Sequence, residues 1–176
     1  IIVLARGRLI SQGTSDEVRQ DSKVQEVYFG SGATFESETV VSDVHAKKAT
    51  STPDQAGPLL SVQSLCAWYG AAQILYDVNF EVKRGEVVAL MGRNGAGKST
   101  TMKALMGLLE KRTGDVQFMG REISKDAAHH IAASGLGYVP EDRRIFTDLT
   151  VLENLEVGRQ KGRLWPDGSA APTWTV

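Results

Sequence analysis

The chain has 176 residues, a formal net charge of −1 at pH 7 and 41% hydrophobic residues, which suits a globular core and gives no overall attraction to nucleic acid or to an anionic membrane. The single cysteine, Cys66, excludes an internal disulfide, is typical of a reducing compartment, and is interpreted as a small core residue of a strand. No apolar run has the length of a membrane span, and no signal peptide opens the sequence.

The N-terminal region predicts a small unit of two strands and a helix. Residues 1–11 indicate two short strands around a turn that contains Gly7. Thr14 or Ser15 can cap a helix that runs to about residue 30. A piece of this size cannot bury a core alone, and the sequence opens on Ile1 rather than Met. We therefore expect the chain to be cut from a longer protein.

Residues 31–58 differ in composition from the regions on either side. Ser, Thr, Gly, Ala and Pro dominate, and the few charges are four acids and two lysines. Such a segment is typical of a flexible linker, because it has too little apolar surface to pack. His45 lies in this segment beside Lys47 and is interpreted as a solvated linker histidine.

The region 59–176 begins with strands. Residues 59–69 and 73–82 are strand-like, and residues 85–91 predict a buried strand that is apolar after its first two positions. Residues 100–109 then predict a helix. Its apolar side chains, Met102, Leu105, Met106 and Leu109, recur at three- and four-residue spacing.

The segment between that strand and that helix, residues 92–99, reads GRNGAGKS and matches the phosphate-binding pattern G-x-x-x-x-G-K-[ST]. Glycines let the backbone turn its N–H groups around an anion, Lys98 adds a mobile cation, and Ser99 offers a hydroxyl ligand for Mg²⁺. The alternative is a glycine-rich turn between two core elements. Phosphate-contacting residues are predicted to be Gly92, Asn94, Gly95, Ala96, Gly97, Lys98, Ser99 and Thr100.

Shorter elements follow the helix. Residues 115–123 predict a hairpin, Ser124 is expected to cap a helix from residue 125 to 133, and residues 136–139 predict a short strand. Thr150 and Glu153 have the spacing of a capping box at the start of another helix. Two neighbouring histidines on the 125–133 helix, His129 and His130, are read as ordinary helix residues, because no further ligand lies at metal spacing.

With these residues, the chain resembles the ATP-binding subunits of ABC transporters, and most closely the ATPases of branched-chain amino acid importers. The resemblance implies an α/β P-loop NTPase fold, in which residues 59–176 form the N-terminal half of one ABC-type nucleotide-binding domain. Residues 1–30 resemble the C-terminal end of another such domain, and residues 31–58 join the two. The implied parent is a fusion of two ABC ATPase domains.

Three features outside the loop support this resemblance. An aromatic near the position of Tyr69 stacks on adenine in the family, and the alternative is a packed strand aromatic. Glu141 occupies the loop where most members carry Gln, and as in the importer branch it implies a carboxylate near Mg²⁺ and the attacking water. An exposed turn charge is the alternative for Glu141. Residues 149–155 resemble the helix start that follows that loop.

The resemblance implies ATP and Mg²⁺ as ligands, with Lys98 and Glu141 in catalytic roles and with Ser99 and Glu141 at the metal. It also implies membrane permease subunits and a second ABC ATPase domain as partners, no nucleic acid, and a peripheral location at the cytoplasmic face of the membrane. Hydrolysis in this family further requires an Asp-Glu strand end, a Leu-Ser-Gly-Gly signature and a switch histidine. None of these occurs in the sequence, so we expect these 176 residues to bind nucleotide without turning it over.

Two other classes of protein remain open. A soluble tandem ABC ATPase that acts on ribosomes also joins two domains, although its linker is expected to be longer and strongly charged. A GTPase or small-molecule kinase shares the phosphate loop, although no Asn-Lys-x-Asp guanine motif occurs in this sequence.

Overall fold

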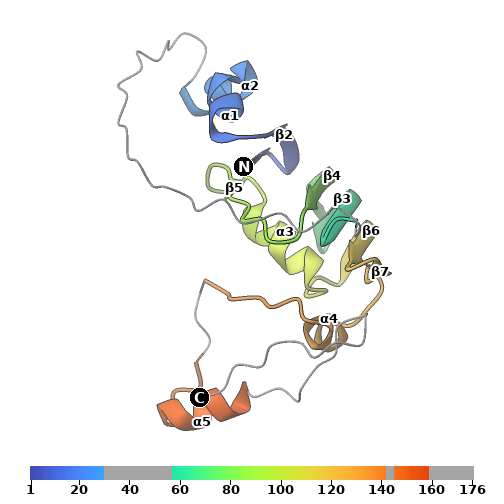
Figure 1. Ribbon diagram of the computed structural model, residues 1–176, viewed down its shortest axis with the longest axis vertical. Helices are drawn as coiled ribbons and strands as arrows, with labels where there is room; N and C mark the ends of the chain where they lie inside the picture. Colours follow the sequence, from blue (N-terminus) through green and yellow to red (C-terminus); the bar gives the residue numbers. More distant parts are fainter. Residues whose placement is uncertain (30–56, 142–144, 159–176) are drawn as a thin grey trace. The chain divides into compact units, whose positions relative to one another are not determined.

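The computed structural model describes residues 1–29, 57–141 and 145–158 (Figure 1). Contacts divide the chain into two compact units, of which the first ends at Leu136. Our predictions for most of the linker, including His45, and for the chain after residue 158 lie outside the described residues.

A three-stranded sheet connects the N-terminal region with the strand that precedes the phosphate loop. Strand β1 (Ile2–Ala5) pairs antiparallel with β2 (Arg8–Gln12), as the sequence predicts, and parallel with β5 (Leu90–Met91). The order is therefore β2-β1-β5. Arg6 and Gly7 both have positive φ, at 49° and 75°, which gives the twist that a two-residue hairpin turn requires.

A second sheet carries most of the core of the first unit. Strands β3 (Leu60–Tyr69), β4 (Ala72–Val82), β6 (Lys111–Phe118) and β7 (Arg121–Glu122) pair antiparallel in the order β4-β3-β6-β7. Strands β3, β4 and β7 were predicted within one residue at each end, whereas β6 begins at Lys111 and includes residues 112–114, where a turn was expected. Fully buried side chains on it are Val62, Leu65, Ala67, Leu75, Val78 and Val116.

A bulge interrupts the β3–β4 ladder on the exposed side of this sheet. Ser64 and Asp77 both take left-handed backbone angles, at φ 50° and 52°. The Asn79 carboxamide connects them, because its oxygen accepts from the Ser64 N–H at 2.7 Å and its nitrogen donates to the Asp77 carbonyl at 2.8 Å. Hydrogen bonds from the Asn79 and Ser64 side chains hold the pKa of the Asp77 carboxyl below its usual value.

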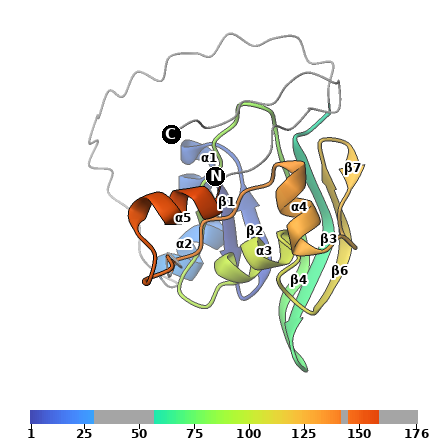
Figure 2. The same ribbon diagram turned by 90° about the horizontal axis from the view of Figure 1, so that it is seen from below.

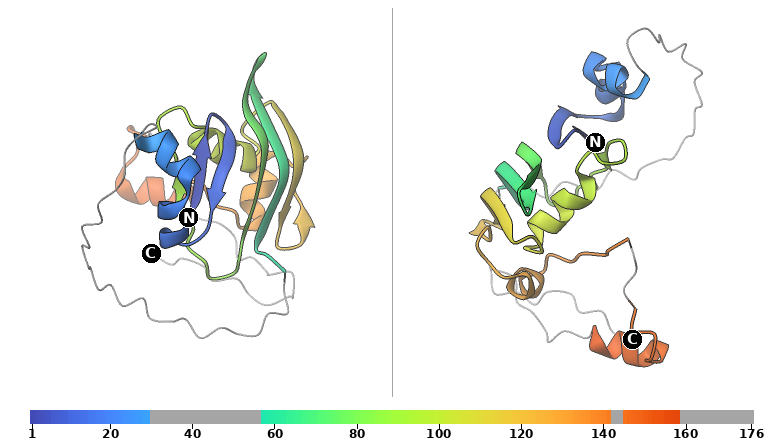
Figure 3. Two further views of the ribbon diagram at one scale, coloured as in Figure 1. Left: turned by 90° about the horizontal axis from the view of Figure 1, so that it is seen from above. Right: turned by 180° about the vertical axis from the view of Figure 1, so that it is seen from behind.

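Five helices complete the described residues: α1 (Ser15–Gln20), α2 (Ser22–Phe29), α3 (Lys98–Leu105), α4 (Ala128–Ser134) and α5 (Val151–Val157). In Figure 2, α3 and α4 lie beside the larger sheet, and Figure 3 shows α1 and α2 next to the β1–β2 hairpin. The single predicted N-terminal helix is two helices, because the backbone extends at Asp21 (ψ 117°).

Capping boxes begin two of these helices; the one at Thr150 was predicted, and at α1 the sequence predicted only a cap at Thr14 or Ser15. Thr14 caps α1 together with Glu17, and Thr150 caps α5 together with Glu153. The backbone N–H of each threonine donates to the glutamate carboxylate, which lowers the pKa of both glutamates.

Other local predictions are wrong. The helix predicted over residues 100–109 begins at Lys98 and ends at Leu105. In residues 85–91 only β5 is a strand, and Val87 is 98% exposed because β1 is the one partner that the described residues provide. Residues 136–139 form no strand, and Val139 is 90% exposed. Ser124 does not cap α4, because its hydroxyl accepts the Val116 N–H at 2.6 Å.

Candidate phosphate-binding site

The glycine loop lies between β5 and α3, as the strand–loop–helix pattern predicts. Residues 92–97 form an irregular segment, and Gly97 is the N-cap of α3 with φ at 107°. Residues with a Cβ rarely adopt this angle, and a Cβ built on Gly97 would lie 2.8 Å from Leu75 Cδ2. The second glycine of the motif is therefore required by both its backbone angle and the packing around it.

Lys98 folds back over the loop that precedes it. Its Nζ donates to the carbonyl oxygens of Gly92 at 2.7 Å and of Arg93 at 3.1 Å. The side chain is half-buried, and the ammonium group lies beside the first two residues of the loop instead of extending into solvent. A phosphate oxygen that enters the loop competes with these neutral carbonyls, and the charge-assisted bond to the anion is the stronger one.

The first turn of α3 supplies further donors. N–H groups at a helix start have no intrahelical acceptor, and here they belong to the residues after Gly97. Ser99 is exposed, whereas Thr101 is fully buried and its hydroxyl donates to the Gly97 carbonyl at 2.9 Å. An exposed hydroxyl beside free amides and an ammonium group fits a phosphate chain with Mg²⁺, because Mg²⁺ takes oxygen ligands.

The N-terminal hairpin contacts this loop, and sequence reasoning did not predict that contact. The Gly7 N–H donates to the Ala96 carbonyl at 2.9 Å. At the other end of the loop, a Cβ on Gly92 would lie 2.6 Å from the Leu4 carbonyl oxygen. No local pattern signals these contacts, because more than eighty residues separate the partners in sequence.

Tyr69 lies at the end of β3 and is 46% exposed. Such exposure does not suit a packed core aromatic, which was the alternative for this residue. Trp68 is half-buried, and the Lys111 ammonium lies 4.8 Å from the centre of its ring. Tyr69 is therefore available for stacking, and its contact with adenine stays a prediction.

Glu141 is an exposed residue of the second unit. Its predicted contact with Mg²⁺ and water stays a prediction, as does the role of each loop residue. Within the described ranges, no group of three or more His, Cys, Asp and Glu side chains is arranged to hold a metal ion. Among the same residues, no helix combines the length and the apolar character that crossing a bilayer requires.

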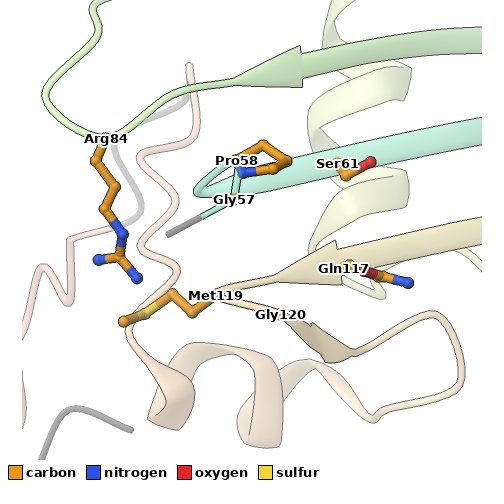
Figure 4. A pocket seen from close by; sticks show the side chains of 7 residues that line it. All are labelled: Gly57, Pro58, Ser61, Arg84, Gln117, Met119 and Gly120. Atoms are coloured by element: carbon orange, nitrogen blue, oxygen red, sulfur yellow. The ribbon is translucent and has the colours of Figure 1, made fainter. Parts of the chain in front are cut away.

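A pocket of about 200 Å³ lies elsewhere on the first unit (Figure 4). Pro58 and Ser61 line it near the start of β3, together with Arg84 after β4 and Met119 at the turn after β6. Because Tyr69 is at the opposite end of β3 and no loop residue lines the pocket, it is not the predicted nucleotide site.

Comparisons with known families match two parts of the chain. Residues 75–173 match a family model described as ABC transporter. Residues 8–34 match one described as branched-chain amino acid ATP-binding cassette transporter.

Individual proteins agree with these matches. The high-affinity branched-chain amino acid transport ATP-binding protein BraG of Pseudomonas aeruginosa is 42% identical over 100 residues, covering 57% of this chain and 43% of BraG. The lipopolysaccharide export system ATP-binding protein LptB of Haemophilus influenzae is 38% identical over 97 residues, covering 55% of this chain and 40% of LptB. A solved ATP-binding subunit of an ABC transporter aligns with a TM-score of 0.50 at 41% identity, covering 56% of this chain and 40% of that one. The chain thus spans less than half the length of these relatives.

Proposed function

This chain belongs to the ABC transporter family, as part of an ATP-binding domain, and from that membership we propose that the complete protein hydrolyses ATP to power transmembrane import. The observation that carries the proposal is the loop at residues 92–97, where backbone amides and the Lys98 ammonium gather at the start of α3. Branched-chain amino acids are the proposed solute, supported by the similarity to BraG and by the family match at residues 8–34. LptB is by its name part of an export system. The transported solute and the direction of transport are therefore the more specific part of the proposal.

In this proposal the loop binds the phosphate chain and positions it. N–H groups from Gly95 to Thr100 donate to phosphate oxygens, and the positive end of the α3 dipole favours the same anion. Lys98 exchanges its two carbonyl partners for the terminal phosphates. Tyr69 stacks on the adenine ring, for which its exposed position at the end of β3 is the support.

Ser99 and Glu141 are the proposed metal ligands. The Ser99 hydroxyl is exposed on the first turn of α3, next to the amides that would hold the β- and γ-phosphates. Bound Mg²⁺ would neutralise charge that develops on the phosphates during transfer. Glu141 would act on the attacking water and connect hydrolysis to the membrane partner. Its support is the family resemblance and its exposed position.

The proposed partners are membrane permease subunits and a second ABC ATPase domain, at the cytoplasmic face of the membrane. We further propose that residues 1–30 derive from the end of a first ATPase domain and residues 59–176 from the start of a second, which the order of the two family matches supports. The ribosome-associated tandem ATPase is the less favoured alternative, because the 31–58 segment has only two lysines with which to bind RNA.

Calorimetric titration of the 176-residue chain with ATP and Mg²⁺ tests the proposal. We expect Lys98→Ala to weaken binding by about tenfold to a hundredfold, because a hydrogen bond to a charged group contributes about 1.5–3 kcal/mol. Lys103→Ala is the matched control, since Lys103 lies on the same helix outside the motif. No heat from the unchanged chain, or equal affinities for the two variants, would contradict the proposal. Titration with GTP distinguishes a GTPase, and phosphate release measures turnover.

A further inference from the structure

The N-terminal segment, residues 1–13, packs in the same unit as the loop at residues 92–97. Its proposed origin in another domain does not explain this packing. Ile2 and Val3 are register partners of Leu90 and Met91, and the Ile2 N–H donates to the Ala89 carbonyl at 2.8 Å. Ile2, Val3 and Leu4 are at most 2% exposed. Strand β5, which leads into the loop, is thus paired with a segment that precedes the linker in sequence.

The turn of this segment fixes a peptide group of the loop. Gly7 donates its N–H to the Ala96 carbonyl at 2.9 Å, and its own carbonyl accepts the Tyr76 N–H at 2.9 Å. In a trans peptide the carbonyl and the following N–H point in opposite directions. Holding the Ala96 carbonyl toward Gly7 therefore directs the Gly97 N–H away from the hairpin, as a phosphate donor requires.

Gly7 fits this place because it has no Cβ. Its φ is 75°, and a Cβ built on it would overlap the Ile74 carbonyl oxygen and lie 3.1 Å from Tyr76 Cδ2. Gly7 Cα is also 3.4 Å from a Cβ built on Gly97. Arg8 continues the contact, with its guanidinium carbon 5.1 Å from the centre of the Tyr76 ring.

We propose that residues 1–13 dock in cis on β5 and the phosphate loop, and that Gly7 is a positioning residue for the loop amides. The docking itself does not depend on the proposed function. Only its consequence for nucleotide affinity rests on ATP binding by this loop.

Gly7→Ala tests the positioning role, with Gly120→Ala as the matched control. Gly120 has nearly the same φ, 77°, but a Cβ there would meet nothing within 4 Å. Both variants therefore add the same left-handed strain, and only Gly7→Ala adds a collision. We expect hydrogen exchange at residues 92–97 to accelerate about tenfold or more in Gly7→Ala, with β3, β4 and β6 exchanging as in Gly120→Ala. Equal effects of the two variants on the loop would overturn the positioning role.

A protease site inserted in the 31–56 segment tests the docking without any substitution in the packed residues. After cleavage of the otherwise unchanged chain, we expect the N-terminal piece to co-purify with the remainder, and the uncut chain to run as a monomer. Separation of the pieces would overturn the docking, and a dimer that exchanges N-terminal segments would overturn the cis arrangement. This experiment also decides the docking if Gly7→Ala does not fold.

Nucleotide affinity tests whether the positioning of the loop by Gly7 affects ATP binding. ATP binding should weaken about tenfold or more in Gly7→Ala and stay within about twofold in Gly120→Ala, because misplaced donors lose most of their contribution. Unchanged affinity in Gly7→Ala would overturn the positioning role. If the unchanged chain binds no ATP at all, the proposed function fails, while the exchange and cleavage results still decide this inference.

Discussion

Leu4→Ala measures how much the N-terminal strand contributes to the folded unit. Leu4 is 0% exposed in the centre of β1, and its carbonyl lies against Gly92 of the loop. Truncation of a fully buried leucine removes its transfer free energy and leaves a cavity, which together cost about 2–5 kcal/mol. Leu108→Ala is the control, because Leu108 is 50% exposed after α3 and its truncation should cost about 1 kcal/mol or less.

Urea unfolding followed by far-ultraviolet circular dichroism gives both values. With m near the 1–3 kcal/mol/M that is usual for small proteins, a loss of about 3 kcal/mol lowers the unfolding midpoint by about 1 M or more. The m-value should not change, since β1 then unfolds together with the rest of the first unit. A midpoint for Leu4→Ala as high as that for Leu108→Ala would refute the reasoning, because it would mean that β1 adds no packing energy to the unit.

Two further predictions concern carboxylates. Asp77→Asn keeps the side-chain shape and the tolerance for a left-handed backbone but removes the charge. Hydrogen bonds lower the pKa of Asp77 in the folded state below its unfolded value of 3.8. The carboxylate therefore stabilises the fold above pH 3.8, and this contribution is lost as pH falls through the folded pKa. The thermal unfolding midpoints of the two proteins should therefore differ near neutral pH and converge as pH falls through the folded pKa of Asp77, and a difference that stays constant with pH would contradict this. Glu141→Ala in the complete protein should reduce transport-stimulated ATP hydrolysis, which phosphate release from the assembled transporter measures, and full stimulation would exclude a coupling role for Glu141.

Local chemistry in the sequence predicted the loop and most elements around it. The pattern at residues 92–99, followed by apolar residues at helical spacing, predicted a glycine loop before α3, and Gly97 indeed has the backbone angle that only glycine adopts readily. The capping box of Thr150 and Glu153 was also predicted, because its bonds join residues three positions apart, whereas for α1 only a cap at Thr14 or Ser15 was predicted and the role of Glu17 was missed. The roles of Tyr69, Lys98, Ser99 and Glu141 in nucleotide chemistry remain predictions.

Other features depend on partners that are distant in sequence, and here local patterns failed. Residues 85–91 have the composition of a buried strand, yet Val87 is exposed because strand length is set by the partner rather than by composition. Ser124 is a good capping residue, but its hydroxyl oxygen instead accepts a hydrogen bond from the Val116 N–H of β6.

The sequence by itself determined where a glycine loop would form and that a helix would follow it, since these depend on backbone freedom and on hydrogen bonds between near neighbours. Only the tertiary structure decided which segment lies against that loop. The Gly7 N–H donates to the Ala96 carbonyl, and the carbonyl of the buried Leu4 lies against Gly92. Such contacts carry no sequence signature, because a backbone carbonyl accepts from any N–H that the fold brings within reach.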